Sequence, residues 1–237
     1  MEQITTGIVI VAGGSGRRMG SEIPKQFLFL GGEPILVRTI NRMAEALPGA
    51  PIVVVLPDEQ QAFWKNLSAR FEVAPHTLAS GGKERFDSVK SGLDTLFALG
   101  EGVELVAIHD GVRPLASVEM IRRCCDCAAT KGSAIPAIAV SDSFRRLTSE
   151  EGDSEIVDRS LLRAVQTPQV FDAHLLRRAY RQPFDPAFTD DASVVEQLGE
   201  RISLCEGERS NLKITTREDI TIAEALLEAQ NDREDGA

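Results

Sequence analysis

Short apolar runs alternate with amphipathic segments along most of the chain. The run GIVIVA at 7–12 has no charged position, which is typical of a parallel strand buried on both faces. In the segment 34–47 apolar residues recur at helical spacing behind Pro34, which predicts a helix with one buried stripe. The same alternation continues, with strands expected at 51–57, 103–110, 133–140 and 201–207 and helices at 58–71, 84–99, 117–132 and 216–230.

This order of elements predicts an α/β fold, in which a mostly parallel twisted sheet carries helices on both faces. The chain has 237 residues, enough for one domain with a full core. It contains no internal repeat and no interdomain linker. The sequence therefore predicts a single domain over residues 1–237.

One segment breaks the alternation. Residues 140–162 contain β-forming residues around the polar turn SEEGDSE and show little helical periodicity, which predicts an inserted β-hairpin. A two-stranded hairpin is marginal alone, so it needs a surface to pack on. Patterning leaves two interpretations open: an arm that joins two copies of the chain in a homodimer, or a flap that folds on its own subunit.

The stretch VAGGSGRRMGSEIPKQF, residues 11–27, follows the first predicted strand and collects glycines, arginines and a lysine. Such a turn can direct backbone N–H groups at an anion, and the cations indicate that this anion carries much charge. The stretch lacks the Gly-Lys-Ser/Thr ending of a P-loop. Met19 stands where the dinucleotide-binding pattern has its third glycine. We therefore expect a different phosphate-binding loop, rather than a plain loop with solvated arginines.

Charge and composition limit the possible partners. The net charge is −10 and the pI is near 4.9, the opposite of a duplex-binding surface, so we expect no nucleic-acid partner. The first apolar run is short and follows MEQITT, which fits neither a signal peptide nor a membrane span. The sequence predicts a cytoplasmic protein that does not bind membranes.

The cysteines lie at Cys124, Cys125, Cys127 and Cys205. Cys124 and Cys127 have the C-x-x-C spacing of a zinc site, but no second pair or histidine lies close in sequence. Reduced, partly buried thiols are the favoured interpretation.

Polar residues follow several predicted strands, and in open parallel sheets ligands bind beyond these carboxyl ends. SGGKERFDSV offers Gly82 and Ser88 before a helix, where a base or ribose could bind. In IHDGVRP, Asp110 ends an apolar strand, where a metal-binding carboxylate would be displayed, and Arg113 follows. Asp110 could instead cap a turn or a helix.

Three later motifs add candidates: Thr167 in QTPQVF, Thr189 in FTDDASVVE and Lys213 in NLKITT. Thr189 is also a natural helix cap, and Lys213 could simply be solvated. His109 should face away from Asp110 on its strand, as a buried, hydrogen-bonded residue. The candidates are thus cations, an Asp and glycines without an evident nucleophile, a set that suits phosphoryl or nucleotidyl transfer.

Taken together, AGGSGRRMGSEIPKQF, GGKERFDSV, HDGVRP, VDRSLLRAVQTPQVF, TDDASVVE and NLKIT resemble the 2-C-methyl-D-erythritol 4-phosphate cytidylyltransferases of the non-mevalonate isoprenoid pathway. The motifs stand in the family's order over nearly the whole chain. The resemblance implies a Rossmann-like nucleotidyltransferase fold with a dimerisation arm. It also implies the reaction of CTP with methylerythritol phosphate, a polyol phosphate, with Mg²⁺ as the cofactor.

By motif position, the resemblance also implies site residues. Arg18 and Lys25 would hold the triphosphate and stabilise the transition state, Lys213 would reach the α-phosphate, and Asp110 would sit by the metal and the sugar hydroxyls. The nucleotide would be bound by Ala12, Gly13, Gly14, Gly16, Gly82, Lys83 and Ser88. The acceptor pocket would contain Arg113, Thr167 and Thr189, together with Ser143 and Arg159 from the other subunit's arm.

The chain departs from the family pattern at three of these positions. Lys83 stands where an acidic residue is common, Ser143 where Thr is usual, and Gly13 where Ala is common.

Two rival functions stay open. Ribitol 5-phosphate cytidylyltransferases share the nucleotide half, although VDRSLL resembles the methylerythritol family. A non-catalytic nucleotide-binding regulator could use the same fold, but it would not need Arg18, Lys25, Asp110 and Lys213 together.

Overall fold

A central sheet organises the computed structural model, which describes residues 5–14, 23–100, 102–150 and 152–235. In this part of the chain the sheet order is β10-β7-β11-β6-β1-β4-β5, with β12 beside β7. The run β6-β1-β4-β5 is parallel throughout. The predicted fold class, a mostly parallel sheet with helices on both faces, is confirmed. The strands are β1 Thr6–Val11, β4 Ile52–Leu56, β5 Thr77–Ser80, β6 Leu105–Asp110, β7 Ser133–Ala139, β10 Arg163–Val165, β11 Gln169–Asp172 and β12 Leu204–Glu206.

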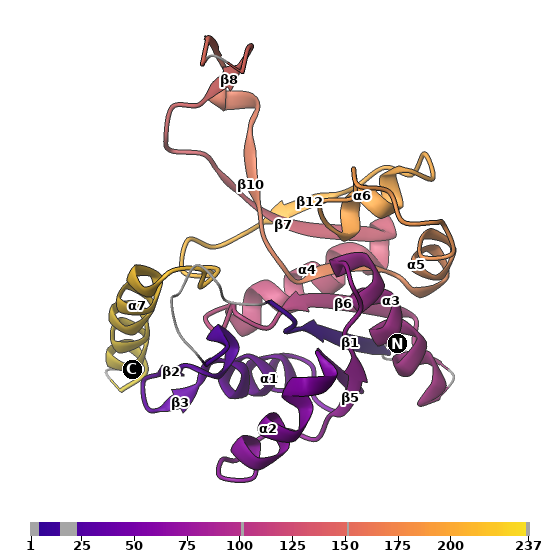
Figure 1. Ribbon diagram of the computed structural model, residues 1–237, viewed down its shortest axis with the longest axis vertical. Coiled ribbons are helices and arrows are strands. Elements are labelled where there is room, and N and C mark those ends of the chain that lie inside the picture. The colour runs from indigo at the N-terminus through magenta and orange to yellow at the C-terminus, as the bar shows by residue number, and fades with distance from the viewer. Residues whose placement is uncertain (1–4, 15–22, 101, 151, 236–237) are drawn as a thin grey trace.

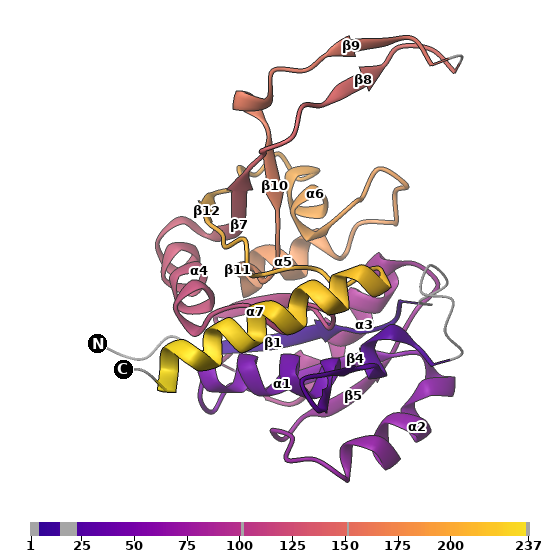
Figure 2. The same ribbon diagram turned by 90° about the vertical axis from the view of Figure 1, so that its left-hand side faces the viewer.

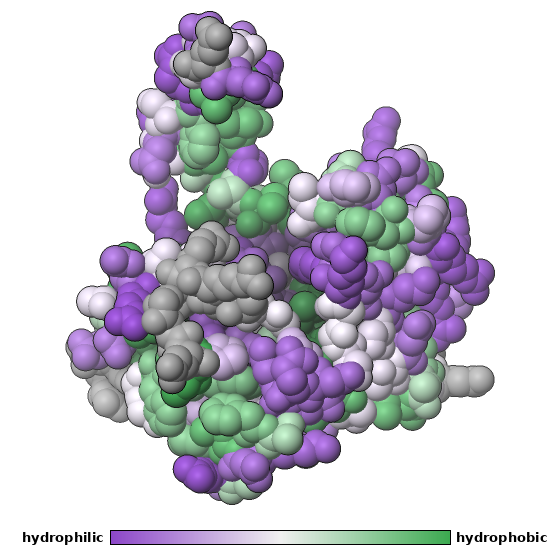
Figure 3. Space-filling model, viewed as in Figure 1, coloured by the Kyte–Doolittle hydropathy of each residue, from purple (hydrophilic) through white to green (hydrophobic). Residues whose placement is uncertain are grey.

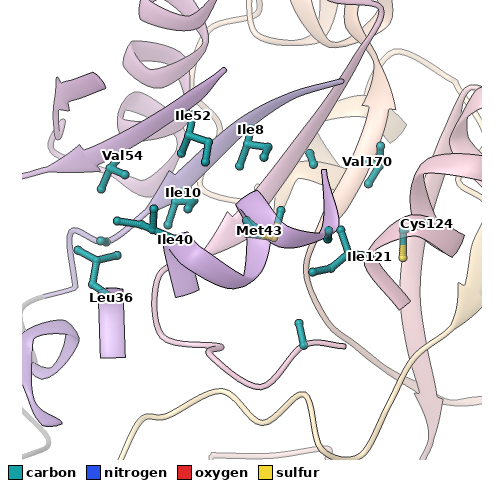
Figure 4. Close-up of a cluster of buried hydrophobic side chains, with 14 of the residues drawn as sticks. Ile8, Ile10, Leu36, Ile40, Met43, Ile52, Val54, Ile121, Cys124 and Val170 are labelled. Atoms are coloured by element: carbon teal, nitrogen blue, oxygen red, sulfur yellow. The ribbon is translucent and has the colours of Figure 1, made fainter. Parts of the chain in front are cut away.

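Helices cover both faces of this sheet (Figures 1 and 2). Successive side chains of β1 point to opposite faces, so Ile8 and Ile10 belong to one core and Val9 to the other. Helices α1 and α4 pack against the first face (Figure 4), and α3, α5 and α6 against the second. The helices are α1 Ile35–Ala46, α2 Asp58–Ser68, α3 Arg85–Ala98, α4 Val118–Lys131, α5 Ala173–Ala179, α6 Asp191–Glu196 and α7 Arg217–Asp235.

The stripe predicted for the first helix is the one that α1 buries. Leu36, Ile40 and Met43 have no exposed surface and lie under β1 and β4 (Figure 4). Each such side chain contributes about 1.5–3 kcal/mol relative to its exposed state. Pro34 stands at the N-cap position, where its fixed φ and missing N–H cost little.

The sheet differs from the prediction at β11. This strand runs antiparallel between β6 and β7, in the region that the sequence showed only as a proline-fixed turn. Val170 and Phe171 are fully buried there. Four residues are too few for periodicity to distinguish a strand from a loop, so pairing with β6 and β7 decides the outcome.

A third apolar cluster lies where α7 packs against the short ribbon of β2 (Phe29–Leu30) and β3 (Glu33–Pro34). Leu227 of α7, Leu30 and Ile214 are buried in this cluster. The Ile214 N–H donates to the Val112 carbonyl at 2.9 Å. This bond holds the late segment around Lys213 beside the end of β6.

The inserted segment extends well away from the sheet (Figures 1 and 2). Its strands β8 (Arg145–Leu147) and β9 (Ser154–Ile156) pair antiparallel and lie inside the predicted range 140–162. Leu147, Ile156 and Leu161 are 70–82% exposed, and hydrophobic side chains of this arm are visible at the upper left of Figure 3.

The structure contains free cysteines, with Cys124 and Cys125 buried and Cys127 and Cys205 partly exposed. Cys124 of α4 and Cys205 of β12 are hydrogen-bonded thiols with 3.2 Å between their sulfur atoms. Within the described ranges, no helix combines the length and the apolar character that crossing a membrane would require.

Candidate active site

A cavity of about 290 Å³ lies at the carboxyl ends of the parallel strands. After β1 the chain adds β4 and β5 on one side, and it then crosses to place β6 on the other. The carboxyl ends of β1 and β6 therefore flank the point where the strand order reverses, which is where ligands bind in open α/β sheets. The predicted residues in its wall are Ala12, Gly13, Gly14, Lys25, Gly82, Lys83, Ser88, Asp110 and Lys213.

A larger cavity, of about 980 Å³, lies at the opposite edge of the sheet, beside Thr5, Thr6 and Leu105. Arg122 lines it, but its Nε and Nη2 donate to the carbonyls of Ala46 and Glu45. The cavity at the carboxyl ends instead combines glycines, cations and an ionised carboxylate, so it is the candidate active site.

Asp110 ends β6 and is nearly buried. Its Oδ2 accepts a bond from Arg113 Nε at 3.1 Å and lies 3.0 Å from Lys213 Nζ. Burial alone would raise the pKa of Asp110, but Lys213, Arg85 and Arg113 lower it by more, so the pKa lies well below its usual range. Asp110 is therefore a carboxylate held among cations.

Lys213 and Arg113 differ in what they can offer a ligand. The Lys213 side chain is 43% exposed and lines the cavity, so it is not simply solvated. Arg113 is 9% exposed, and its Nη1 donates to the Asn211 carbonyl at 2.8 Å. Arg113 thus connects the segment around Lys213 to Asp110 without itself lining the cavity.

Thr167 holds Asp110 from the backbone side. Its Oγ1 accepts the Asp110 N–H at 3.0 Å and lies 3.0 Å from Nδ1 of His109, to which its O–H donates. The His109 Nε2–H then donates to the Arg113 carbonyl. Burial lowers the pKa of His109 to about 4, so the imidazole is neutral. The expectation of a buried, hydrogen-bonded His109 is met.

The neutral His109 predicts an acid-sensitive fold. Between pH 6.5 and 4 the unfolded chain binds up to one more proton at this residue than the folded chain. The free energy of unfolding therefore decreases as the pH is lowered through this window. The free energy of unfolding changes by about 3 kcal/mol across this window. Urea unfolding of the wild type and of His109→Gln at several pH values measures it. Equal pH dependence in the two proteins would contradict the assignment.

Two glycines of the cavity wall are set by close contacts. A Cβ on Gly82 would lie 2.2 Å from the Asp87 Cβ, which leaves no room for another residue. A Cβ on Gly14 would lie 3.3 Å from Lys25 Cε, so the Lys25 side chain passes directly over the glycine turn. Gly13 has no such neighbour, with Pro57 at 3.8 Å.

Ser88 supports the second turn rather than exposing its hydroxyl. Its Oγ accepts the Gly82 N–H at 3.0 Å and donates to the Glu84 carbonyl at 3.1 Å. Glu84 and Asp87 form a capping box at the start of α3. Lys83 is exposed at the tip of this turn.

Several predicted residues lie elsewhere. Ser143 and Arg159 are exposed on the arm, where Arg159 Nη1 donates to the Ser141 carbonyl. Thr189 is exposed just before α6 and outside the cavity wall. Gly16 and Arg18 lie outside the described residues.

A two-pronged ion pair in the cavity wall was missed from the sequence. Arg85, in the cavity wall, donates from Nη1 and Nη2 to both carboxylate oxygens of Asp191, at 2.8 and 2.6 Å. The residues are 106 positions apart, so no local pattern joins them. The only available signal was that both fall inside chemistry-bearing motifs, GGKERFDSV and TDDASVVE.

The donor set limits how a metal could bind. Within the described ranges, no cluster of three or more His, Cys, Asp or Glu side chains is placed to hold a metal ion. Mg²⁺ commonly binds through one or two carboxylates together with waters and substrate phosphates. The ionised carboxylate of Asp110 in the cavity wall fits a Mg²⁺ ion that arrives with a nucleotide, and does not fit a preformed metal cage.

Curated relatives match the chain over almost its full length. The protein from Bacteroides fragilis named 2-C-methyl-D-erythritol 4-phosphate cytidylyltransferase is 52% identical over 221 residues, which are 92% of this chain and 98% of that protein. A protein of the same name from Geobacillus kaustophilus is 39% identical over 222 residues, 92% of this chain and 95% of that protein.

Solved structures agree. The 2-C-methyl-D-erythritol 4-phosphate cytidylyltransferase of Thermus thermophilus superposes with a TM-score of 0.73 at 30% identity, over 94% of this chain and 98% of that one. The 4-diphosphocytidyl-2C-methyl-D-erythritol synthase of Anaerococcus prevotii gives 0.77 at 27% identity, with the same coverage. The family model for 2-C-methyl-D-erythritol 4-phosphate cytidylyltransferase matches residues 6–229. A cavity lined by glycine turns and cations, on this fold and over this length of match, therefore places the chain in the 2-C-methyl-D-erythritol 4-phosphate cytidylyltransferase family.

Proposed function

We propose that the chain transfers CMP from CTP to 2-C-methyl-D-erythritol 4-phosphate, giving 4-diphosphocytidyl-2-C-methyl-D-erythritol and pyrophosphate, in the non-mevalonate route to isoprenoid precursors. The observation that carries the proposal is the cavity at the strand-order reversal, where glycine turns, Lys25, Lys213 and Asp110 converge. The assignment of the two substrates comes from membership of the family. The protein acts in the cytoplasm.

The nucleotide occupies the two glycine turns. Backbone groups of Ala12, Gly13 and Gly14 face the triphosphate, and Gly82 and Lys83 flank the cytosine and ribose. Gly16, which lies outside the described residues, is assigned to the triphosphate by its place in the motif. Ser88 shapes the second turn, because both hydrogen bonds of its hydroxyl go to that turn. The small size of Gly82 is required here, since any side chain would meet Asp87.

The reaction is a displacement at phosphorus. A phosphate oxygen of the acceptor forms a bond to the α-phosphorus of CTP, the bond from that phosphorus to the bridging oxygen breaks, and pyrophosphate leaves. Lys25 and Arg18 stabilise the charge that develops on the leaving group, and Lys213 holds the α-phosphate. Positioning and charge neutralisation supply the catalysis, without a covalent enzyme intermediate.

Asp110 is the residue that would hold Mg²⁺ beside the nucleotide phosphates. A bound Mg²⁺ ion would neutralise part of the triphosphate charge. The carboxylate stays ionised throughout the neutral pH range because of its three cationic neighbours.

The acceptor pocket begins at Asp110 and extends toward Thr189. Arg113 and Thr167 help to form it by holding Asp110 in place. Arg113 bonds the Asp110 side chain, and Thr167 bonds the Asp110 backbone N–H. Ser143 and Arg159 come from the arm of a second subunit, and Arg159 clamps the acceptor phosphate. This arrangement requires a homodimer.

The arm supports that homodimer through its exposed apolar surface. Leu147, Ile156 and Leu161 would cost hydrophobic free energy if left in water, and a second copy would bury them. In both views the arm extends away from its own sheet, so it is placed to reach a neighbour (Figures 1 and 2).

Mixing two impaired variants tests whether the sites are shared. Arg159→Ala is expected to raise mainly the KM for the polyol phosphate, and Lys25→Ala to lower turnover. In a mixed dimer one site regains both side chains, so statistical mixing should restore about a quarter of the wild-type rate. Steady-state kinetics before and after mixing measure this effect. No recovery in dimers shown to have exchanged subunits would place Arg159 in its own subunit's site.

Incubation with CTP, Mg²⁺ and methylerythritol phosphate tests the proposed reaction. Mass spectrometry should show the diphosphocytidyl product, and CTP alone should release no pyrophosphate. Nucleotide binding without product would instead favour the regulator.

A further inference from the structure

The pairing of Arg85 with Asp191 joins two regions that the proposed function uses separately. Arg85 is the first residue of α3, directly after the Gly82–Glu84 turn, and its side chain is 31% exposed in the cavity wall. Asp191 is the first residue of α6, two positions after Thr189, and its side chain is fully buried. The pair therefore links the nucleotide turn to the acceptor loop.

Asp191 is hydrogen-bonded on both oxygens. In addition to the two bonds from Arg85, Oδ1 accepts the Tyr180 hydroxyl at 2.6 Å. A two-pronged Arg–carboxylate contact fixes orientation as well as distance. Movement of α6 relative to α3 would break both charge-assisted bonds from Arg85 at once.

The segment that carries Thr189 is hydrogen-bonded to the first turn of α6. The Thr189 and Asp190 N–H groups both donate to Ser193 Oγ, and Asp190 caps α6. Gln169 of β11 bonds Asp190 and the Ala192 N–H. Thr189 is thus part of one hydrogen-bonded unit with α6, and Asp191 is the point where that unit meets α3.

Cohesion of this junction does not require charges. Phe86, next to Arg85, stacks on Tyr180 with 4.9 Å between ring centroids and on Phe188 with 5.7 Å. Buried ion pairs contribute little net stability compared with apolar residues of similar volume. A charged, directional pair beside an aromatic cluster is therefore better explained by a need for fixed geometry.

We propose that Arg85 is a positioning residue, which by holding Asp191 sets the distance between the acceptor phosphate at the Thr189 loop and the nucleotide at the start of α3. The inference rests on the proposed function. It assigns roles to Arg85, Asp191 and Tyr180, none of which needs to touch the reacting atoms.

The test separates geometry from folding. Arg85→Lys keeps the charge but can make only a single-point contact. The double variant Arg85→Met, Asp191→Leu removes the ion pair without leaving a buried charge, so it should fold. Both should lower kcat tenfold to a hundredfold, on the order of the loss from a small misplacement of reactants. They should also raise the KM for the polyol phosphate, while the KM for CTP stays within a few-fold.

A purely structural role gives a different result. It would reduce the fraction of active enzyme, which scales kcat and leaves both KM values unchanged. Arg178→Lys is the matched control and should behave as wild type. Arg178 lies on the neighbouring α5 and forms an exposed ion pair with Glu200. Wild-type kinetics in a folded double variant would overturn the proposal. An inactive wild type would instead overturn the proposed function itself.

Discussion

Replacing Lys25 by alanine is expected to lower kcat on the order of a hundredfold to a thousandfold, the usual loss when one preorganised transition-state donor is removed. The Lys25 side chain passes over Gly14 in the cavity wall, where a nucleotide triphosphate would lie. The charge that it faces grows as pyrophosphate departs, so its contribution is larger in the transition state than in bound CTP. The KM for CTP should therefore rise much less than kcat falls.

Steady-state kinetics at saturating acceptor, together with calorimetric CTP binding, separate these two quantities. Lys90→Ala, on the exposed side of α3, is the control and should leave both unchanged. A Lys25→Ala enzyme with kcat within a few-fold of wild type would show that the loop lysine only binds ground-state phosphate, or does not contact the nucleotide.

Asp110→Asn is expected to cost both turnover and stability. The amide removes the negative charge that Arg113, Lys213 and Arg85 share, so the cations repel one another and the proposed Mg²⁺ ligand is lost. Turnover should fall about a hundredfold or more. Because Arg113 is 9% exposed and keeps its charge, unfolding should become easier by about 3 kcal/mol.

Thermal and urea unfolding at two pH values complete this test. The native pKa of Asp110 is depressed, so its stabilisation is complete above the ordinary Asp pKa of about 4 and is lost as pH falls below that value. The Asn variant should lack this acid dependence, whereas Asp94→Asn on the exposed surface of α3 should retain it. Full activity in a folded Asp110→Asn enzyme would remove Asp110 from the mechanism.

The parallel half of the fold follows from local pattern. The GIVIVA run and the stripe of Leu36, Ile40 and Met43 are strong enough that packing only confirms them. The antiparallel half does not follow, because β11 is short and its direction is set by β6 and β7, whose paired residues lie 61–67 and 36–38 positions earlier in the chain. Such pairing is a tertiary effect, and no window of the sequence contains it.

The residues of the site likewise divide into those that the sequence could predict and those that only the fold brings together. Glycines and cations next to strand ends could be recognised from spacing. Asp110 and Lys213, which the sequence offered as separate candidates, form an ion pair in the structure. The support of Asp110 by Thr167, 57 residues away, could not be read from the sequence. Neither could the pairing of Arg85 with Asp191, because each looks like an ordinary helix-start residue until the fold brings them together.

Pyrophosphate release with purified protein, Mg²⁺ and CTP, with methylerythritol 4-phosphate compared against ribitol 5-phosphate, tests the central claim most directly. The account predicts rapid release with methylerythritol phosphate and little with ribitol phosphate. Preference for ribitol phosphate would leave the nucleotide site intact but contradict the acceptor assignment, and release with neither acceptor would contradict cytidylyl transfer to a polyol phosphate altogether.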